Sequence, residues 1–226
     1  MKTLFVNGSP RKNFNTVQLL EKAAEGARAA GAETELVHIY DKPFKGCISC
    51  FACKVKNSRC NGLCAYRDDL HPLLEKAYEA DVIVIGSPVY FNNATAGTRA
   101  FLERLMFPID TYMVDESGNR LNVLHKPVQT AVIYDMNCPE DFMDMVNYRM
   151  LLGDVEHELA RLFGYSEILY VNNTYQFKDY SRYDINMFPE EMKKNQLEKH
   201  FPIDLQNAYD LGKRLTERAL EGGVRE

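Results

Sequence analysis

The sequence lacks an excess of basic residues, long apolar runs and the common nucleotide-binding loops. Lys and Arg total 27 against 32 Asp and Glu, which gives a net charge of −5. A nucleic-acid binder would need a basic face, so the composition argues against that class. No apolar run approaches the roughly 18 residues of a membrane span, and the first residues have no signal-peptide pattern. We therefore expect a cytoplasmic protein with no membrane partner.

Cysteine is scarce except in one segment. Residues 46–64 read GCISCFACKVKNSRCNGLC and hold five of the six cysteines. In a reducing compartment these thiols are more often free, metal-bound or redox-active than paired in structural disulfides. The segment is therefore a candidate metal or redox site.

Short buried-type strands alternate with helical spacing along the whole chain. Strands are predicted at 3–6, 33–39, 81–87, 127–134 and 166–172, and helices at 16–30, 69–79, 94–106, 140–162 and 203–221. Such alternation is typical of a parallel sheet covered by helices on both faces. The five-strand count predicts one flavodoxin-like α/β domain over residues 1–226, with a doubly wound five-stranded parallel sheet in three α/β/α layers.

Three stretches are longer than simple connections. They are a cysteine-rich insertion at 40–68, a hairpin at 107–126 with its tip near Ser117-Gly118-Asn119, and a tyrosine-rich excursion at 173–200. Long segments without obvious secondary structure are the usual places for function in a compact domain.

The loop after the first predicted strand has the composition of an anion site. It reads GSPRKNFNT over residues 8–16 and offers two hydroxyls, a guanidinium and the free N–H groups of a helix start. A phosphate monoester needs such donors and the positive end of a helix dipole. The loop matches neither the Walker A pattern nor G-x-G-x-x-G. The alternative is an Asn- and Ser-rich turn that only caps the helix.

The loop after the third predicted strand is aromatic. Residues 86–93 read GSPVYFNN. Aromatic side chains are costly to leave on a loop unless they cover something flat, so Pro88, Tyr90 and Phe91 are candidates to cradle a ring such as isoalloxazine.

Together the segments GSPRKNFNT and GSPVYFNNATAGTRAFLERL resemble the flavodoxin-like NADPH-dependent FMN reductase family, and especially its iron–sulfur flavoprotein branch. The resemblance implies that FMN binds here. It also implies a third, glycine-containing loop after the fourth strand, where this chain has Tyr134-Asp135-Met136-Asn137 without the glycine. The implied phosphate ligands are Ser9, Arg11, Asn15 and Thr16, and the implied ring contacts are Ser87, Pro88, Val89, Tyr90, Phe91, Asn92, Tyr134 and Asp135.

The activity implied by this resemblance is electron transfer through FMN. NADH or NADPH would reduce the flavin, which would pass electrons to a small-molecule or redox-protein acceptor. No side chain is nominated as a catalytic acid or base, because the flavin N5 carries the chemistry. One alternative is an iron–sulfur flavoprotein that acts as an electron carrier without pyridine nucleotide. Another is a zinc-binding interaction module with a degenerate flavin site.

The cysteine segment allows several interpretations. Cys47, Cys50, Cys53 and Cys60 have the spacing of a 4Fe–4S site, and the resemblance implies a cluster near the flavin edge. Cys64 is the alternative fourth ligand, because it precedes Arg67-Asp68-Asp69 as in flavoprotein relatives. The same family also contains cluster-free cysteine loops. Zinc and a thiol/disulfide switch stay open as well.

The tyrosine-rich excursion is either surface or interface. Its aromatic density favours an interface, and the resemblance implies a homodimer or homotetramer. The residues concerned are Tyr175, Phe177, Tyr180, Tyr183, Phe188 and Phe201.

Overall fold

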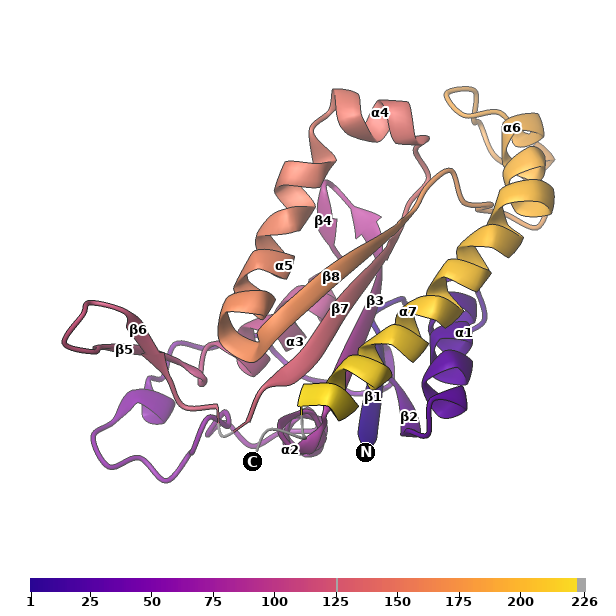
Figure 1. Cartoon of the computed structure of the whole chain (residues 1–226). Coiled ribbons are helices and arrows are strands. Elements are labelled where there is room, and N and C mark those ends of the chain that lie inside the picture. Colours follow the sequence, from indigo (N-terminus) through magenta and orange to yellow (C-terminus); the bar gives the residue numbers. More distant parts are fainter. Residues whose placement is uncertain (125, 223–226) are drawn as a thin grey trace.

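The computed structural model describes residues 1–124 and 126–222 and has a parallel sheet at its centre (Figure 1). Its strands run in the order β2-β1-β3-β7-β8. Their bounds are β1 (Lys2–Asn7), β2 (Glu33–His38), β3 (Val82–Tyr90), β7 (Val128–Asp135) and β8 (Gly164–Val171). This is the flavodoxin-like order, so the predicted fold class is confirmed.

The central strands are apolar throughout because helices cover both faces of the sheet. Val84 pairs with Phe5 on one side and with Ala131 on the other, and all three are buried. Continuous burial of this kind explains why these segments read as unbroken apolar runs and lack alternation.

Two helical layers enclose the sheet. On one face α1 (Asn15–Ala29) and α7 (Phe201–Gly222) share a core with the sheet that includes Leu19, Leu20 and Leu211. On the other face lie α2 (His71–Glu79), α3 (Ala96–Met106) and α5 (Tyr148–Phe163), with a core that includes Phe101 and Leu152. The α/β/α layering is therefore as expected.

The structure differs from the predicted elements at two places. A short strand β4 (Asn93–Ala94) pairs antiparallel with β3 and joins the sheet at its carboxyl end. The helix predicted over 140–162 is divided into α4 (Glu140–Met145) and α5. Asn147 separates them in the left-handed region, with φ of 59°, a conformation that asparagine tolerates better than most residues.

The three long segments lie at two ends of the sheet (Figure 1). The excursion contains a 3-10 turn (Tyr180–Arg182), α6 (Glu190–Asn195) and a π-helical turn (Gln196–His200), and α6 lies at the end to which β3 and β7 point. The hairpin β5 (Asp110–Val114) with β6 (Arg120–Asn122) lies at the opposite end, beside the cysteine segment. Among the described helices, none is both long and apolar enough to cross a membrane.

Candidate functional site

The loops after β1 and β3 are joined at the carboxyl end of the sheet. The Gly8 N–H donates to the Gly86 carbonyl at 2.8 Å, and the Thr95 hydroxyl donates to the Gly8 carbonyl at 2.7 Å. A Cβ added at Gly8 would lie 1.9 Å from the Thr98 hydroxyl oxygen and 2.9 Å from the Gly86 carbonyl oxygen. Glycine at position 8 therefore allows the two loops to meet.

Residues of these two loops line one pocket, together with the end of β7 and one residue of the excursion. Of the predicted cofactor-binding residues, the pocket is lined by Ser9, Arg11, Asn15, Thr16, Pro88, Tyr90 and Asp135; Phe14 and Gln176 complete it. The structure thus brings the whole predicted phosphate set to one place.

Three side-chain donors of the first loop each contact an oxygen. Arg11 Nη1 donates to the Gln176 carbonyl at 2.6 Å, and Asn15 Nδ2 donates to the Tyr175 carbonyl at 2.9 Å. Thr16 Oγ1 donates to Asp135 Oδ1 at 2.6 Å. A guanidinium, an amide and a hydroxyl beside a helix N-terminus are the donors that a phosphate group requires. The residues present therefore fit the phosphate end of FMN.

Two residues of the pocket were missed by the sequence analysis. Phe14 lies beneath the Arg11 guanidinium, whose carbon is 4.6 Å from the ring centroid, and this cation–π contact orients the arginine. Gln176 comes from the excursion and is 165 residues from Arg11 along the chain. No local spacing signals a contact of that range.

Several predicted ring contacts do not line the pocket. Ser87 is buried and serves its own loop: it accepts from the Thr95 N–H at 3.0 Å and donates to the Pro88 carbonyl at 2.9 Å. Tyr134 is buried in the core, where its ring stacks on Tyr170. Val89 packs against the same core.

The next two residues of the loop after β3 have an unusual backbone. Phe91 has φ of 47° and a fully exposed ring, and Asn92 has φ of 65°. Left-handed backbone at a bulky residue is strained, and such strain gathers at functional sites. The side chain of Phe91 is exposed to solvent on the loop after β3 and does not line the pocket.

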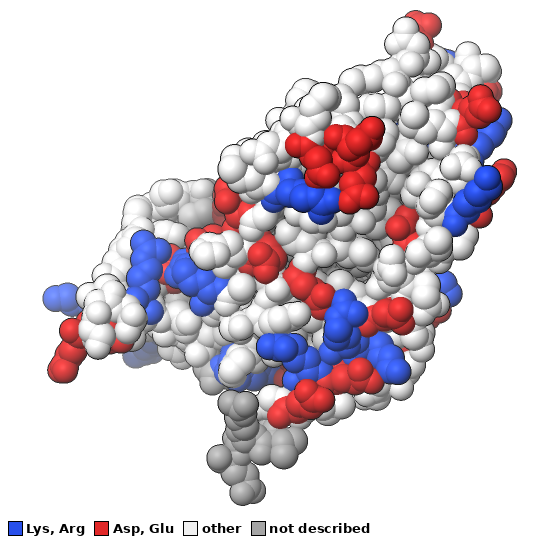
Figure 2. All heavy atoms as spheres, turned by 45° about the horizontal axis from the view of Figure 1, so that its top comes forward, with Lys and Arg blue, Asp and Glu red and all other residues white. Residues whose placement is uncertain are grey.

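The charge of the pocket is mixed. Burial raises the pKa of Asp135 to about 6, and burial also raises the pKa of the Tyr90 phenol. On the face shown in Figure 2, acidic and basic residues are interspersed without an extended basic patch. The positive charge that the lining residues offer a ligand is that of Arg11.

The cysteines form a second pocket. Cys47, Cys50, Cys53 and Cys64 line it, whereas Cys60 is not among the lining residues and its Sγ lies 3.8 Å from the Ala52 carbonyl oxygen. All six thiols are free. Within residues 1–124 and 126–222, no group of three or more His, Cys, Asp or Glu side chains is placed to hold a metal ion as it stands. The thiols that share one space are thus the three of the C-x2-C-x2-C run and Cys64.

A buried arginine fixes the end of the cysteine segment. Arg104, which is 1% exposed, lines the same pocket and pairs with Asp68 at 2.5 Å. It also donates to the Tyr66 carbonyl at 2.7 Å. The residues that follow Cys64 are therefore held against α3 by a desolvated ion pair, which positions Cys64 at the pocket.

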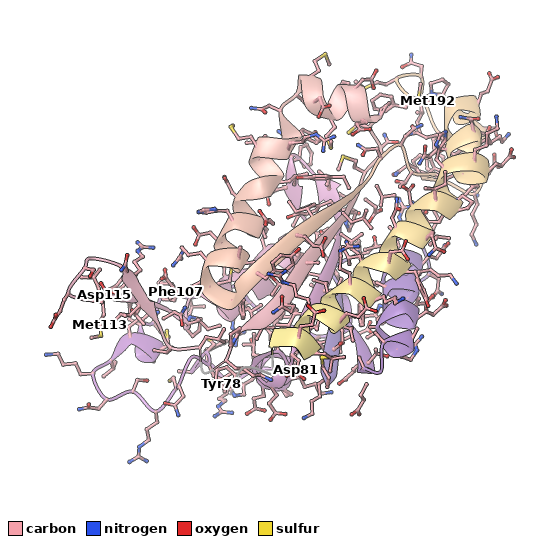
Figure 3. The ribbon with its side chains drawn as sticks, viewed as in Figure 1. Tyr78, Asp81, Phe107, Met113, Asp115 and Met192 are labelled. Atoms are coloured by element: carbon pink, nitrogen blue, oxygen red, sulfur yellow. The ribbon has the colours of Figure 1, made fainter. Side chains whose placement is uncertain are left out.

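The cysteine pocket lies at one end of α3, and the pocket lined by Arg11, Asn15 and Thr16, called the phosphate pocket below, lies at the other. Thr95, which caps α3, bonds to the phosphate loop, while Phe107 just beyond α3 lines the cysteine pocket. The 11 residues of α3 span about 16 Å, and Figure 3 shows Phe107 and Met192 of the excursion far apart in the molecule. The segment that leads to the cysteines runs along α3, because the Tyr40 hydroxyl accepts from the Gly97 N–H and the Cys47 N–H donates to Glu103. It therefore carries the cysteines away from the pocket around Arg11 within one chain.

Comparison with known sequences gives a family. The family model of NADPH-dependent FMN reductase matches residues 1–133. An iron–sulfur flavoprotein of Archaeoglobus fulgidus is 43% identical over 104 residues, and one of Methanosarcina thermophila is 34% identical over 104 residues. These alignments cover 46% of this chain and 48% and 52% of the two relatives, so the match spans about half of each protein.

Solved structures with similar folds are more distant in sequence. An NAD(P)H:quinone oxidoreductase from Methanothermobacter marburgensis has a TM-score of 0.67 at 15% identity and covers 95% of this chain and 98% of its own. An azoreductase from Bacillus anthracis has a TM-score of 0.66 at 15% identity, with 95% and 99% coverage. Likeness at this identity shows a shared fold.

Proposed function

Because the chain belongs to the NADPH-dependent FMN reductase family, we propose that it is an FMN-dependent oxidoreductase that takes electrons from NADH or NADPH. The acceptor is a small molecule or a redox protein. The observation that carries the proposal is the convergence of Arg11, Asn15 and Thr16 on one pocket at the carboxyl end of the sheet.

The residues of the chain hold and orient the cofactor. When bound, FMN supplies hydride transfer and single-electron transfer. Arg11, Asn15 and Thr16 bind the phosphate, and Pro88 with Tyr90 forms the adjoining wall. No side chain is assigned a proton-transfer role in the reaction, in line with chemistry that belongs to the cofactor.

The test is anaerobic reduction of the FMN-loaded protein by NADPH and by NADH. Loss of the oxidised flavin absorbance with at least one of them is expected, followed by its return when oxygen or a quinone is added. Tightly bound flavin that neither nucleotide reduces would contradict the reductase activity. That result would favour an electron carrier that is reduced by another redox protein.

A second candidate function is favoured by the cysteine pocket. We propose that Cys47, Cys50, Cys53 and Cys64 hold a 4Fe–4S cluster, because these four thiols line one space. The relatives named iron–sulfur flavoproteins support this assignment. Anaerobic reconstitution with iron and sulfide should give about four irons per chain, whereas binding of zinc alone would contradict it.

The separation of the two pockets favours a homo-oligomer, either a dimer or a tetramer. A cysteine pocket far from its own flavin pocket can serve the flavin pocket of another copy. Large apolar side chains are exposed near both pockets, among them Met113 in the hairpin and Tyr183 and Met187 in the excursion, as at association surfaces. Light scattering should show two or four chains per particle, and a monomer at micromolar concentration would contradict this arrangement.

Replacing Arg11 with alanine should weaken FMN binding about 10- to 100-fold. A charge-assisted hydrogen bond to phosphate contributes roughly 1.5–3 kcal/mol, and each 1.4 kcal/mol corresponds to about tenfold in affinity. Equilibrium titration of the apoprotein measures the change. Arg28→Ala is the matched control, because Arg28 lies in the last turn of α1, and its FMN affinity should not change. Equal affinity in both variants would remove Arg11 from the site.

A further inference from the structure

A buried carboxylate occupies the phosphate end of the pocket. Asp135 is the last residue of β7, is 5% exposed and accepts a hydrogen bond from the Thr16 hydroxyl at 2.6 Å. The neighbouring groups of the first loop are donors. An ionised Asp135 would disfavour binding of a phosphate dianion in this pocket, because two close negative charges repel each other strongly away from water.

The Thr16 hydroxyl can serve only one acceptor at a time. It has a single proton to donate, and that proton now goes to Asp135. Protonation of Asp135 changes this: the carboxylic acid donates its own proton to Thr16 Oγ1, and the Thr16 proton is then free for a phosphate oxygen. One proton added at Asp135 both removes the charge repulsion and restores a donor to the ligand.

We propose that Asp135 takes up one proton from solvent when the FMN phosphate binds, so that the pocket binds FMN together with a proton. The protonation of Asp135 thereby determines whether the pocket can hold the negatively charged phosphate. The proposal rests on FMN as the cofactor and concerns the binding step alone. It predicts that FMN affinity falls as pH rises.

The groups around Asp135 agree with this assignment. Thr16 faces it from α1, Arg11 from the loop after β1 and Tyr90 from β3. Tyr90 stays neutral between pH 6.5 and 8.5, because burial raises the pKa of that phenol. Burial also raises the pKa of Asp135 to about 6, so the carboxyl is mostly ionised at pH 7.5 until a dianion arrives beside it.

Between pH 6.5 and 8.5 the effect of Asp135 on affinity can be distinguished from titration of the FMN phosphate. A phosphate monoester loses its second proton near a pKa of about 6, so FMN is largely a dianion throughout pH 6.5–8.5. If one proton is bound with the ligand, affinity falls by up to about tenfold for each pH unit across this window. Riboflavin lacks the phosphate, so it should bind the same pocket without this dependence.

The experiment is titration of the apoprotein with FMN and with riboflavin at pH 6.5, 7.5 and 8.5, in wild type and in Asp135→Asn. Calorimetry in two buffers of different ionisation enthalpy counts the protons bound. The wild-type dissociation constant for FMN should rise by up to about tenfold per pH unit, with close to one proton taken up at pH 7.5. Asp135→Asn should show neither effect, since its amide donates to Thr16 at every pH.

The outcomes are distinguishable. Equal pH slopes in wild type and Asp135→Asn, or no proton uptake by the wild type, would overturn the role of Asp135 while leaving FMN as the cofactor. The proton count needs only the wild-type protein, so the test does not depend on the variant folding. If FMN bound at none of the three pH values, the proposed function would be overturned, and this inference with it.

Discussion

A Cys64→Ser variant should lose its iron, while a Cys60→Ser variant should keep about four irons per chain. Spacing alone places Cys60 as the fourth ligand, seven residues after the last cysteine of the C-x2-C-x2-C run. The structure places Cys64 at the shared pocket instead, whereas Cys60 Sγ lies near the Ala52 carbonyl. A ligand must reach the common space, so position in the fold decides the assignment.

The two serine variants are a matched pair, because they make the same chemical change four residues apart. Both should bind FMN as the wild type does, since the phosphate pocket lies at the other end of α3. Iron and flavin are quantified in the same reconstituted samples. Iron retained by Cys64→Ser and lost by Cys60→Ser would reverse the assignment, and loss of flavin with iron in both would mean that the segment is needed for folding.

Gly212→Ala should lower the free energy of unfolding by about 3 kcal/mol. A Cβ at Gly212 would lie 1.9 Å from the Ala23 carbonyl oxygen of α1, and a Cβ at Gly26 would lie 1.9 Å from the Tyr209 carbonyl oxygen of α7. The two helices thus cross in backbone contact. A methyl group forced between them must separate the helices, and overpacking of this kind usually costs 1–3 kcal/mol or more.

The control is the same substitution at an open position of another helix. Gly153 lies in α5, and a Cβ there has nothing within 4 Å. Gly153→Ala should therefore stabilise the protein by roughly 0.5–1 kcal/mol, through helix propensity alone. Urea unfolding of both variants measures the contrast. A Gly212→Ala variant as stable as the wild type would show that α1 and α7 pack more loosely than described.

The fold was predictable because its signals are local. Each central strand is an unbroken apolar run, and each covering helix has an apolar stripe, so strand order and layering follow from general rules. The division at Asn147 was not predictable, because the helical spacing continues across it. The division into α4 and α5 depends on the left-handed backbone of Asn147. Asparagine tolerates this conformation but does not require it.

The site was predictable only where its residues are close in sequence. Ser9, Arg11, Asn15 and Thr16 lie within eight residues of one another, and all four line one pocket. The hydrogen bond between Thr16 and Asp135 joins residues 119 apart in the sequence. It depends on how α1 packs beside the end of β7, which local sequence does not reveal. Asp135 was therefore expected against the flavin ring, whereas the structure places it at the phosphate loop.

The location of the cysteine pocket depends on tertiary contacts as well. Cysteine spacing identifies a candidate ligand set but says nothing about the direction in which the segment leaves the sheet. The Cys47 N–H donates to Glu103 at 3.0 Å, and Arg104 holds the other end of the segment through Asp68. These contacts with the second half of α3 determine the distance between the two candidate redox sites.

A crystal structure of the protein with FMN is the most direct test of where the cofactor binds. The phosphate is expected against Arg11, Asn15 and Thr16, with the Tyr175 and Gln176 carbonyls displaced from these donors. The flavin ring should lie along Pro88 and Tyr90. A phosphate bound elsewhere, with the Arg11 and Asn15 hydrogen bonds to the excursion intact, would contradict it.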